Sequence, residues 1–155
     1  MVNEKERAPG FTLRGIDESG VEREFSLKDF SGKVVLYFYP KDNTPGCTTE
    51  ACDFRDNMAR VKSTGAEVLG VSPDSVKSHM NFKEKHGLAF PLLSDPDKKV
   101  AALYGAYGEK KMYGKVAMGI IRSTFIIDEE GLVKKLWRPV KVDGHVEAVI
   151  EALNS

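Results

Sequence analysis

The chain has 155 residues, 41% of them hydrophobic and 30% charged, which is the balance of an ordinary globular protein. Its 23 Lys and Arg residues equal its 23 Asp and Glu residues, so the formal net charge is zero and neither nucleic acid nor an anionic membrane surface is expected as a partner. No apolar run approaches the roughly 18 residues of a membrane span, and the polar N-terminus lacks the apolar stretch of a secretory signal, so we expect a cytoplasmic protein.

The first half of the chain predicts alternating strands and helices. Segments 11–14 and 21–25 flank a turn at Gly20 and predict an N-terminal hairpin. Segment 33–39 is apolar without alternation, which indicates a strand covered on both faces. Next we expect a helix over about 47–62 and a strand at 67–72. Ser72 or Asp74 is expected to cap a further helix that runs to about His86.

The second half continues the alternation and then changes pattern. Leu92 and Leu93 predict a short strand, and Asp95-Pro96 predicts the start of a short helix. Segment 105–119 contains several Gly and Lys residues and is interpreted as irregular. The remaining elements are a helical face shared by Val100, Leu103 and Tyr104, a hairpin made by 124–128 and 132–137, and a final helix over 143–153.

These elements predict one α/β domain over residues 1–155. The chain contains no repeat, low-complexity tract or linker-like change of composition. Strands alternating with helices, followed by a hairpin and a helix, predict a central mixed sheet flanked by helices. This is the element order of a thioredoxin-like fold with an N-terminal β-hairpin, although the order alone does not single that fold out.

The two cysteines carry the chemical interest of the sequence. Cys47 follows Thr44-Pro45-Gly46, and because Pro45 and Gly46 do not suit a helix interior, Cys47 is expected at the first turn of a helix. Free backbone N–H groups and the positive end of the helix dipole lie there, and both favour the thiolate form of a cysteine. The alternative interpretation is a buried cysteine that only fills the core.

Helical geometry separates Cys47 from Cys52. A stripe of apolar residues spaced 3, 4 and 3 apart marks the core-facing side; Cys47 projects onto its centre, and Cys52 projects about 140° away, toward solvent. Residues five apart in a helix have Cα atoms roughly 8.7 Å apart, whereas a disulfide requires less than about 7 Å. A bond between the two sulfurs therefore requires local unwinding. The stripe consists of Ala51, Phe54, Met58 and Val61.

Three stretches resemble one known family. The active-site stretch of peroxiredoxins is similar to residues 40–54, which are PKDNTPGCTTEACDF. The Pro-x3-Thr-x2-Cys pattern is specific to that family, and a cysteine five residues further on resembles the peroxiredoxin Q group, also called bacterioferritin comigratory proteins. The two other stretches that resemble this group are SHMNF at 78–82 running on to FPLLSD at 90–95, and GIIRSTFIID at 119–128.

The resemblance implies a role for five residues. Cys47 is implied as the peroxidatic cysteine and Cys52 as the resolving cysteine. Thr44 is implied to supply a hydroxyl hydrogen bond to the peroxide or the thiolate. Arg122 is implied to hold its guanidinium near the sulfur, and Pro40 to form a wall of the pocket. An arginine suits this place, because its permanent charge stabilises both a thiolate and a developing oxyanion.

The resemblance also implies a reaction without metal, haem or flavin. Cys47 would reduce hydrogen peroxide or an organic hydroperoxide and become a sulfenic acid, and Cys52 would then close an intramolecular disulfide. A thioredoxin-like dithiol would reduce that disulfide by exchange. No cysteine lies near the end of the given sequence that could form the disulfide with Cys47 of a second subunit, so we expect a monomer or a weak dimer.

Less specific interpretations exist for several residues. Cys52 alone could be an idle surface thiol, and Thr44 alone a turn or capping residue. Glu50 is interpreted as a first-turn carboxylate that suits the helix dipole, with an active-site contact as the second interpretation. His79 and His86 lie two helical turns apart without further ligands nearby in the sequence, so we expect no metal site, and His79 is interpreted as a polar residue packed on its helix.

Three other functions compete with a peroxidase. A thiol–disulfide oxidoreductase without peroxidase activity normally uses Cys-x2-Cys, whereas four residues separate the cysteines in this sequence. A cysteine hydrolase needs a histidine base beside Cys47, and none of the three histidines has an indicative context. A partner-binding module would leave the Thr-Pro-Gly-Cys segment unexplained.

Overall fold

The structure, a computed structural model, describes the backbone of residues 1–155 and every side chain except that of Met112. A seven-stranded sheet forms its centre, with the strand order β2-β1-β5-β4-β3-β8-β9. These strands are β2 (Glu22–Ser26), β1 (Thr12–Ile16), β5 (Leu92–Ser94), β4 (Ala66–Ser72), β3 (Lys33–Phe38), β8 (Ser123–Ile127) and β9 (Val133–Trp137).

Strand directions in the sheet are mixed. The central strands β3, β4 and β5 run parallel, whereas β1, β2, β8 and β9 add antiparallel pairs on either side. The carboxyl ends of the three parallel strands therefore meet at one edge of the sheet, and the loops that follow them lie together there. The predicted α/β fold with a mixed sheet and an N-terminal hairpin is confirmed.

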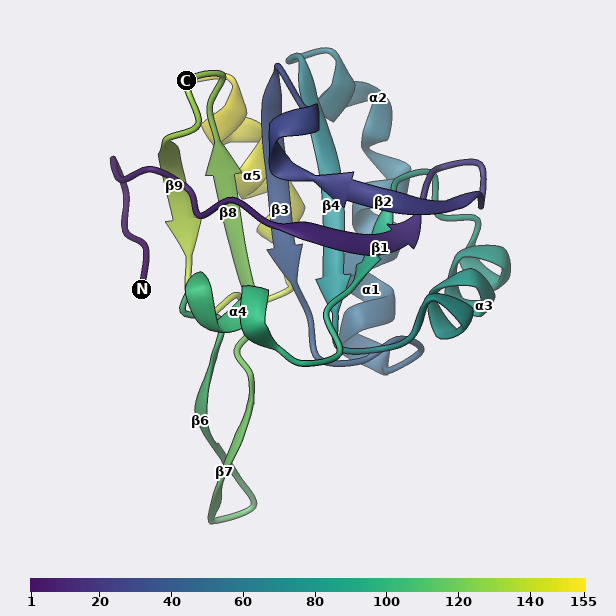
Figure 1. Ribbon diagram of the computed structural model, residues 1–155, viewed down its shortest axis with the longest axis vertical. Helices are drawn as coiled ribbons and strands as arrows, with labels where there is room; N and C mark the ends of the chain where they lie inside the picture. Colours follow the sequence, from purple (N-terminus) through teal and green to yellow (C-terminus); the bar gives the residue numbers. More distant parts are fainter.

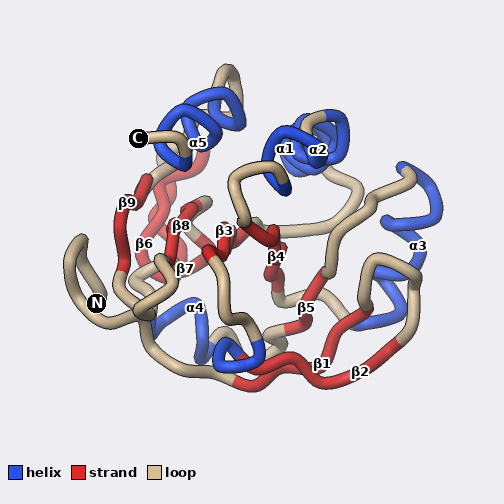
Figure 2. The backbone as a smooth tube through the Cα atoms, turned by 90° about the horizontal axis from the view of Figure 1, so that it is seen from above, coloured by secondary structure: helices blue, strands red, loops and turns tan.

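Helices cover both faces of this sheet (Figures 1 and 2). Helices α1, α2 and α5 lie on one face, α4 and the N-terminal segment lie on the other, and α3 lies beside β1 and β5. The helices are α1 (Pro45–Asp56), α2 (Met58–Lys62), α3 (Val76–His86), α4 (Lys99–Leu103) and α5 (His145–Leu153), with a 3₁₀ turn at Leu27–Asp29.

Strand β3 divides the apolar core into two parts. Its side chains alternate between the faces, so Val35 and Tyr37 pack in the cluster under α1 and α5, while Leu36 and Phe38 pack in the cluster under α4. All four are at most 1% exposed. The prediction of a strand covered on both faces is confirmed, and burial of this size supplies most of the folding free energy.

The single helix predicted over 47–62 is two helices. Helix α1 begins at Pro45, and Asn57 interrupts the path before α2 starts. The Asn57 side chain donates a hydrogen bond to the carbonyl oxygen of Asp53 (2.8 Å), a local bond that competes with regular helical pairing. The predicted apolar stripe is nevertheless buried in full, since Ala51, Phe54, Met58 and Val61 are between 0% and 8% exposed.

Three helix details differ from the predictions. Helix α3 is capped by Ser75, whose Oγ accepts from the backbone N–H of Ser78 (3.1 Å), rather than by Ser72 or Asp74. Helix α4 begins at Lys99, although Asp95 reaches its first turn and accepts from the N–H of Ala101 (2.9 Å). Leu103 is 52% exposed and does not share the buried face, because α4 is only five residues long.

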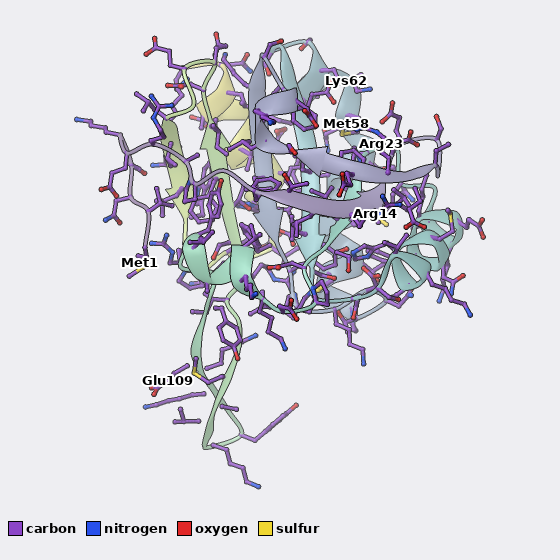
Figure 3. All side chains as sticks on the ribbon, viewed as in Figure 1. Met1, Arg14, Arg23, Met58, Lys62 and Glu109 are labelled. Carbon is purple, nitrogen blue, oxygen red and sulfur yellow. The ribbon has the colours of Figure 1, made fainter. Side chains whose placement is uncertain are left out.

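The segment interpreted as irregular is a two-stranded ribbon. Strands β6 (Tyr107–Met112) and β7 (Lys115–Ile120) pair antiparallel and project from the body of the molecule. Tyr113 and Gly114 both have positive φ, as the tight hairpin turns that match strand twist require. Exposed side chains, among them that of Glu109, line the ribbon (Figure 3), so it lacks the apolar alternation of a half-buried strand.

No helix in the described chain has both the length and the apolar character needed to cross a bilayer.

Candidate active site

Cys47 lies in the first turn of α1, at the edge of the sheet where β3 ends. Thr44 is the residue before the helix, Pro45 is its first residue, and the carbonyl oxygen of Thr44 accepts the first helical bond from the N–H of Thr48 (2.8 Å). The backbone N–H of Cys47 is therefore among those that have no helical partner. The side chain is 2% exposed and packs in the core cluster, so the predicted position of Cys47 is confirmed.

Arg122 joins the sulfur to a buried carboxylate. Its Nη2 lies 3.3 Å from the Sγ of Cys47, and its Nη1 donates to Oε1 of Glu50 at 2.8 Å. Arg122 precedes β8, which pairs with β3, and this pairing brings a residue 75 positions away in the sequence to the start of α1. One planar guanidinium thus contacts both groups, which a single ammonium does not do with the same geometry.

Glu50 is fully buried beside this guanidinium. Burial raises the pKa of Glu50 to about 7, and the charge and hydrogen bond of Arg122 lower it only in part. Its second oxygen, Oε2, has no hydrogen-bond partner among the described residues. The first turn of α1 holds no acidic residue, so the interpretation of Glu50 as a first-turn carboxylate is wrong, and the second interpretation, a contact in the active site, is confirmed. The spacing of three residues from Cys47, which places both side chains on one helix face, could have indicated the contact.

Neighbouring groups stabilise the charged form of Arg122. Burial alone would lower the pKa of Arg122, but Glu50 and Cys47 together raise it above its ordinary value. Arg122 therefore carries its positive charge at every physiological pH. A positive charge at 3.3 Å stabilises a thiolate on Cys47 and any negative charge that develops on an oxygen beside it.

Thr44 and Pro40 lie in the loop before α1, which leads to Cys47. The Thr44 hydroxyl donates its hydrogen to the carbonyl oxygen of Lys41 (2.8 Å), which leaves its lone pairs free to accept a hydrogen bond. Pro40 and Arg122 line one pocket of about 510 Å³, together with residues of the β6–β7 ribbon. The other lining residues are Glu109, Lys110, Lys111, Ile121 and Pro139.

Cys52 lies in the same helix but faces away from Cys47. It is half-buried, whereas Cys47 is buried, and both are free thiols. Both fall inside α1, so ideal helix geometry separates their Cα atoms by roughly 8.7 Å. The structure therefore brings Cys47 and Arg122 into contact, places Pro40 beside Arg122 in one pocket and Thr44 at the start of α1, and leaves Cys52 apart from the Cys47 sulfur.

A contact between two polar residues near this site was not predicted from the sequence. Asp42 is 4% exposed and His79 is 0% exposed, and a contact of 2.7 Å joins Oδ2 of Asp42 to Nδ1 of His79. His79, interpreted from the sequence as a polar residue packed on its helix, is a fully buried member of a polar cluster. The described residues contain no group of three His, Cys, Asp or Glu side chains arranged to hold a metal ion.

Comparisons with known proteins identify the family of this chain. A model of the AhpC/TSA family matches residues 5–136. A putative peroxiredoxin Bcp of Coxiella burnetii is 52% identical over 96% of both chains, and the peroxiredoxin Bcp of Bacillus subtilis is 50% identical over 96% of this chain and 92% of its own length.

Solved structures give the same result. Peroxiredoxin Q of Xanthomonas campestris is 48% identical, covers 92% of this chain and 89% of its own, and superposes with a TM-score of 0.83. A peroxiredoxin Q mutant of Xylella fastidiosa is 37% identical and also gives a TM-score of 0.83, covering 99% of this chain and 98% of its own. The chain therefore belongs to the AhpC/TSA family and is a peroxiredoxin of the Bcp/peroxiredoxin Q type, a thiol-dependent peroxidase.

Proposed function

We propose that Cys47 is the peroxidatic cysteine and Cys52 the resolving cysteine of this peroxidase. The Cys47 thiolate attacks one peroxide oxygen, the O–O bond breaks, and the leaving oxygen departs as water or an alcohol after taking a proton. Cys47 is oxidised to a sulfenic acid. The contact that carries this assignment is the 3.3 Å approach of the Arg122 guanidinium to the Cys47 sulfur at the start of a helix.

Arg122, Thr44 and Pro40 shape the reaction around this sulfur. Arg122 stabilises the attacking sulfur and the charge that develops on the leaving oxygen. Thr44, whose hydrogen is engaged by Lys41, acts as an acceptor for the peroxide O–H. Pro40 forms part of the wall of the adjoining pocket and keeps water away from the reacting oxygens.

Glu50 keeps the guanidinium in place. Its contact with Nη1 leaves Nη2 directed at the sulfur, so the arginine cannot rotate toward solvent without leaving a buried carboxyl without its partner. Because the pKa of Glu50 is about 7, the group changes charge in the physiological range. Glu50 acts through Arg122 and is therefore a positioning residue.

Resolution of the sulfenic acid requires part of α1 to unwind. Cys52 attacks the oxidised sulfur of Cys47, water leaves, and an intramolecular disulfide forms. The helical separation exceeds the limit of about 7 Å for a disulfide, so the first turns of α1 must open. Opening exposes Cys47 and Ala51, which are buried in the reduced protein. The disulfide form therefore loses packing contacts that form again when the disulfide is reduced.

We propose hydrogen peroxide and organic hydroperoxides as substrates and a thioredoxin-like dithiol as the reductant. The apolar side chains of Pro40, Ile121 and Pro139 beside Arg122 suit an alkyl group. The Xanthomonas campestris bacterioferritin comigratory protein, 47% identical, has a described alkyl peroxide reduction activity. A dithiol reduces the Cys47–Cys52 disulfide by exchange, and the disulfide becomes accessible because the unwound turn exposes it.

Both cysteines of the proposed cycle belong to one chain, so the reaction needs no second subunit. We propose that the protein works as a monomer or weak dimer. Cycling through a dithiol also requires a reducing compartment, which supports a cytoplasmic location.

Mass spectrometry after one equivalent of hydrogen peroxide tests the assignment. The wild-type protein should gain one oxygen and then lose water to give the disulfide. The Cys52→Ser variant should stop at the sulfenic acid, and Cys47→Ser should not consume peroxide at a comparable rate. Normal turnover by Cys47→Ser would refute the peroxidatic assignment. Normal cycling of Cys52→Ser with thioredoxin would refute Cys52 as the resolving residue.

The same experiment separates this function from a thiol–disulfide oxidoreductase. An oxidoreductase without peroxidase activity would exchange its disulfide with a dithiol but would not react rapidly with peroxide. Its reduced form would show no sulfenic acid on the time scale of the first step.

A further inference from the structure

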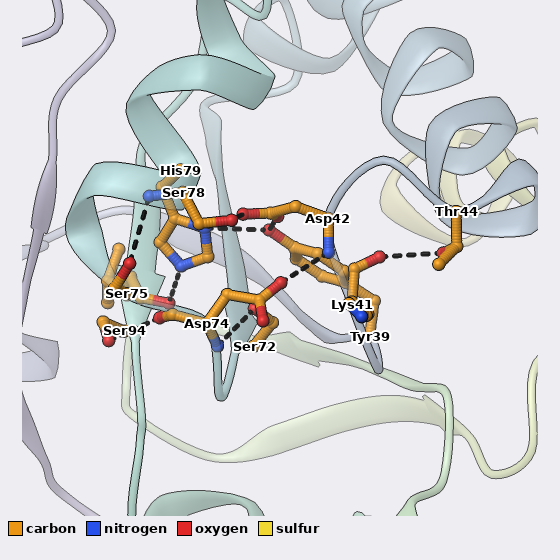
Figure 4. Close-up of polar contacts among 11 residues, drawn as sticks. Tyr39, Lys41, Asp42, Thr44, Ser72, Asp74, Ser75, Ser78, His79 and Ser94 are labelled. Atoms are coloured by element: carbon orange, nitrogen blue, oxygen red, sulfur yellow. Dashed lines mark hydrogen bonds and ion pairs between the residues drawn. The ribbon is translucent and has the colours of Figure 1, made fainter.

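A buried polar cluster lies beside the active site and takes no part in the proposed chemistry. It occupies the edge of the sheet where the parallel strands β3, β4 and β5 end (Figure 4). Asp42 and His79 form its centre, and both are almost completely excluded from solvent. Buried ionisable groups are costly to a fold unless every polar atom is paired, so a cluster of this kind needs a physical reason.

The carboxylate of Asp42 receives hydrogen bonds on both oxygens. Tyr39 donates its hydroxyl to Oδ1 at 2.7 Å, and Ser78 donates its hydroxyl to Oδ2 at 2.8 Å. Nδ1 of His79 lies 2.7 Å from Oδ2. The two hydroxyl donors and the imidazole contact offset the cost of burying this carboxyl group. The carboxylate therefore fixes the loop that carries it to helix α3.

His79 is fixed at both ring nitrogens. Its Nε2 lies 2.8 Å from the carbonyl oxygen of Leu93 in β5. A carbonyl oxygen only accepts, so Nε2 donates this hydrogen bond, while Nδ1 faces the Asp42 carboxyl group. The imidazole thus links three elements that are distant in the sequence: the loop after β3, the helix α3 and the strand β5 (Figure 4).

The loop 40–44 is also fixed through its backbone. The N–H of Asp42 donates to Oδ2 of Asp74 at 2.6 Å, and the carbonyl oxygen of Lys41 accepts from the hydroxyl of Thr44 at 2.8 Å (Figure 4). The carbonyl oxygen of Asp74 in turn accepts from the hydroxyl of Ser94 at 2.6 Å. This loop begins with Pro40, ends with Thr44, and leads directly into the turn that holds Cys47.

We propose that Asp42 and His79 are positioning residues for the peroxide step. They hold the loop 40–44 in the shape that brings Pro40, Thr44 and the Cys47 sulfur to the guanidinium of Arg122. None of the hydrogen bonds of Asp42 and His79 described above involves the Cys47 sulfur, so their effect is on geometry. The inference rests on the proposed role of Cys47 as the peroxidatic residue.

Two reactions of the same sulfur separate positioning from general stability. Attack on a peroxide requires the sulfur, the Thr44 hydroxyl and the Arg122 guanidinium to be aligned around the peroxide. A misplacement of 1 Å can lower the rate about 100-fold. Alkylation by iodoacetamide requires an accessible thiolate and none of this alignment. A loss of positioning therefore slows the first reaction and spares the second.

The test uses Asp42→Asn in a Cys52→Ser background, so that only Cys47 reacts. Asparagine keeps the size of the side chain and replaces one of the two carboxyl oxygens that accept from Tyr39 and Ser78. The control is Ile127→Val, which removes one buried methylene at the far end of β8 and costs about 0.5–1.5 kcal/mol of stability without touching the loop. Stopped-flow oxidation by hydrogen peroxide and alkylation by iodoacetamide are measured for each protein, with circular dichroism to verify folding.

We expect Asp42→Asn to slow oxidation about 10- to 100-fold while its alkylation rate changes less than about twofold. The control variant should keep both rates within about twofold of the parent. If Asp42→Asn does not fold, Tyr39→Phe, which removes a single donor to Asp42, is measured instead and should slow oxidation by about 3- to 10-fold, with alkylation unchanged.

Two results would overturn the inference: a folded variant that is oxidised at the parental rate, or one whose oxidation and alkylation rates fall in parallel. Failure of the proposed function looks different. In that case the Cys52→Ser parent itself would not react rapidly with peroxide. A parent that reacts rapidly beside an unaffected variant rejects the positioning role alone.

Discussion

The unwinding of α1 can be tested at Thr49, which lies between the two cysteines. Thr49 is exposed, and its hydroxyl donates to the carbonyl oxygen of Pro45 at 3.0 Å. The variants Thr49→Ala and Thr49→Gly both lose this hydroxyl, so they differ only in backbone preference. Glycine is about 1 kcal/mol less favourable than alanine inside a helix. If disulfide formation requires this turn to open, that difference lowers the cost of opening directly.

A difference of about 1 kcal/mol corresponds to roughly a fivefold change in the population of the open turn. We therefore expect Thr49→Gly to form the Cys47–Cys52 disulfide roughly five times faster than Thr49→Ala. The earlier oxidation of Cys47 should differ by less than about twofold, because Thr49 does not contact the sulfur and surface substitutions have small effects. Rapid quenching with a thiol reagent, followed by mass spectrometry, separates the two steps.

The matched control is the same pair of substitutions at Asn81. This residue is exposed in the middle of α3, so Asn81→Gly should lower global stability relative to Asn81→Ala by a similar amount. Its two variants should form the disulfide at equal rates. Equal rates for the two Thr49 variants, or a faster Thr49→Ala, would refute the requirement for unwinding at this turn.

Three further predictions concern Arg122 and two titratable groups on which its charge acts. Arg122→Lys should lower the rate of Cys47 oxidation about 100- to 1000-fold in stopped flow, because one ammonium does not reproduce both contacts of the fork; a loss below about threefold would contradict the role of Arg122. Burial raises the pKa of Glu50 from 4.5 to about 7, so the native state binds the extra proton in this range and the stability contributed by this group falls as the pH rises from 4.5 to 7. Glu50→Gln should remove this fall, roughly 3 kcal/mol, in denaturant titrations across that range, and an unchanged pH profile would argue against a buried protonated Glu50. Burial, with a smaller effect of Arg122, lowers the pKa of His145 to about 4, so the folded protein loses stability as the pH falls from 6.5 to 4. His145→Gln should reduce this loss in denaturant titrations. Equal acid sensitivity of the variant and the wild type would contradict the prediction.

Local patterns made part of the structure predictable. The continuous apolar run of β3 indicates burial on both faces, because that periodicity depends only on neighbouring residues. The stripe containing Ala51 and Phe54 likewise fixed the buried face of α1, and with it the opposite positions of Cys47 and Cys52. The role of Arg122 came from the resemblance to peroxiredoxins, since nothing in its immediate neighbours distinguishes it from a surface arginine.

Contacts distant in the sequence were not predictable in the same way. Glu50 is buried because Arg122 lies beside it, 72 residues away, and His79 is buried because Asp42, 37 residues away, supplies a carboxylate. Glutamate is usually exposed and histidine is intermediate in burial, so composition and periodicity do not indicate these two buried contacts. Only the pairing of β3 with β8, and the meeting of β3, β4 and β5 at one edge, brings these partners together.

The β6–β7 ribbon was not predicted from the sequence, for a different reason. Its side chains are mostly exposed on both faces, so the apolar alternation that marks a half-buried strand is absent. The informative feature was the Tyr113-Gly114 turn, in which both residues have positive φ, and glycine supplies only one of the two at no steric cost.

Hydrogen exchange of the reduced and the disulfide forms tests most directly whether Cys47 and Cys52 can meet only through local unfolding. In the disulfide form, the amides of residues 48–54 should lose protection, while those of α3 should exchange at the same rate in both forms. Full protection of residues 48–54 in a protein shown by mass spectrometry to contain the Cys47–Cys52 disulfide would contradict the account.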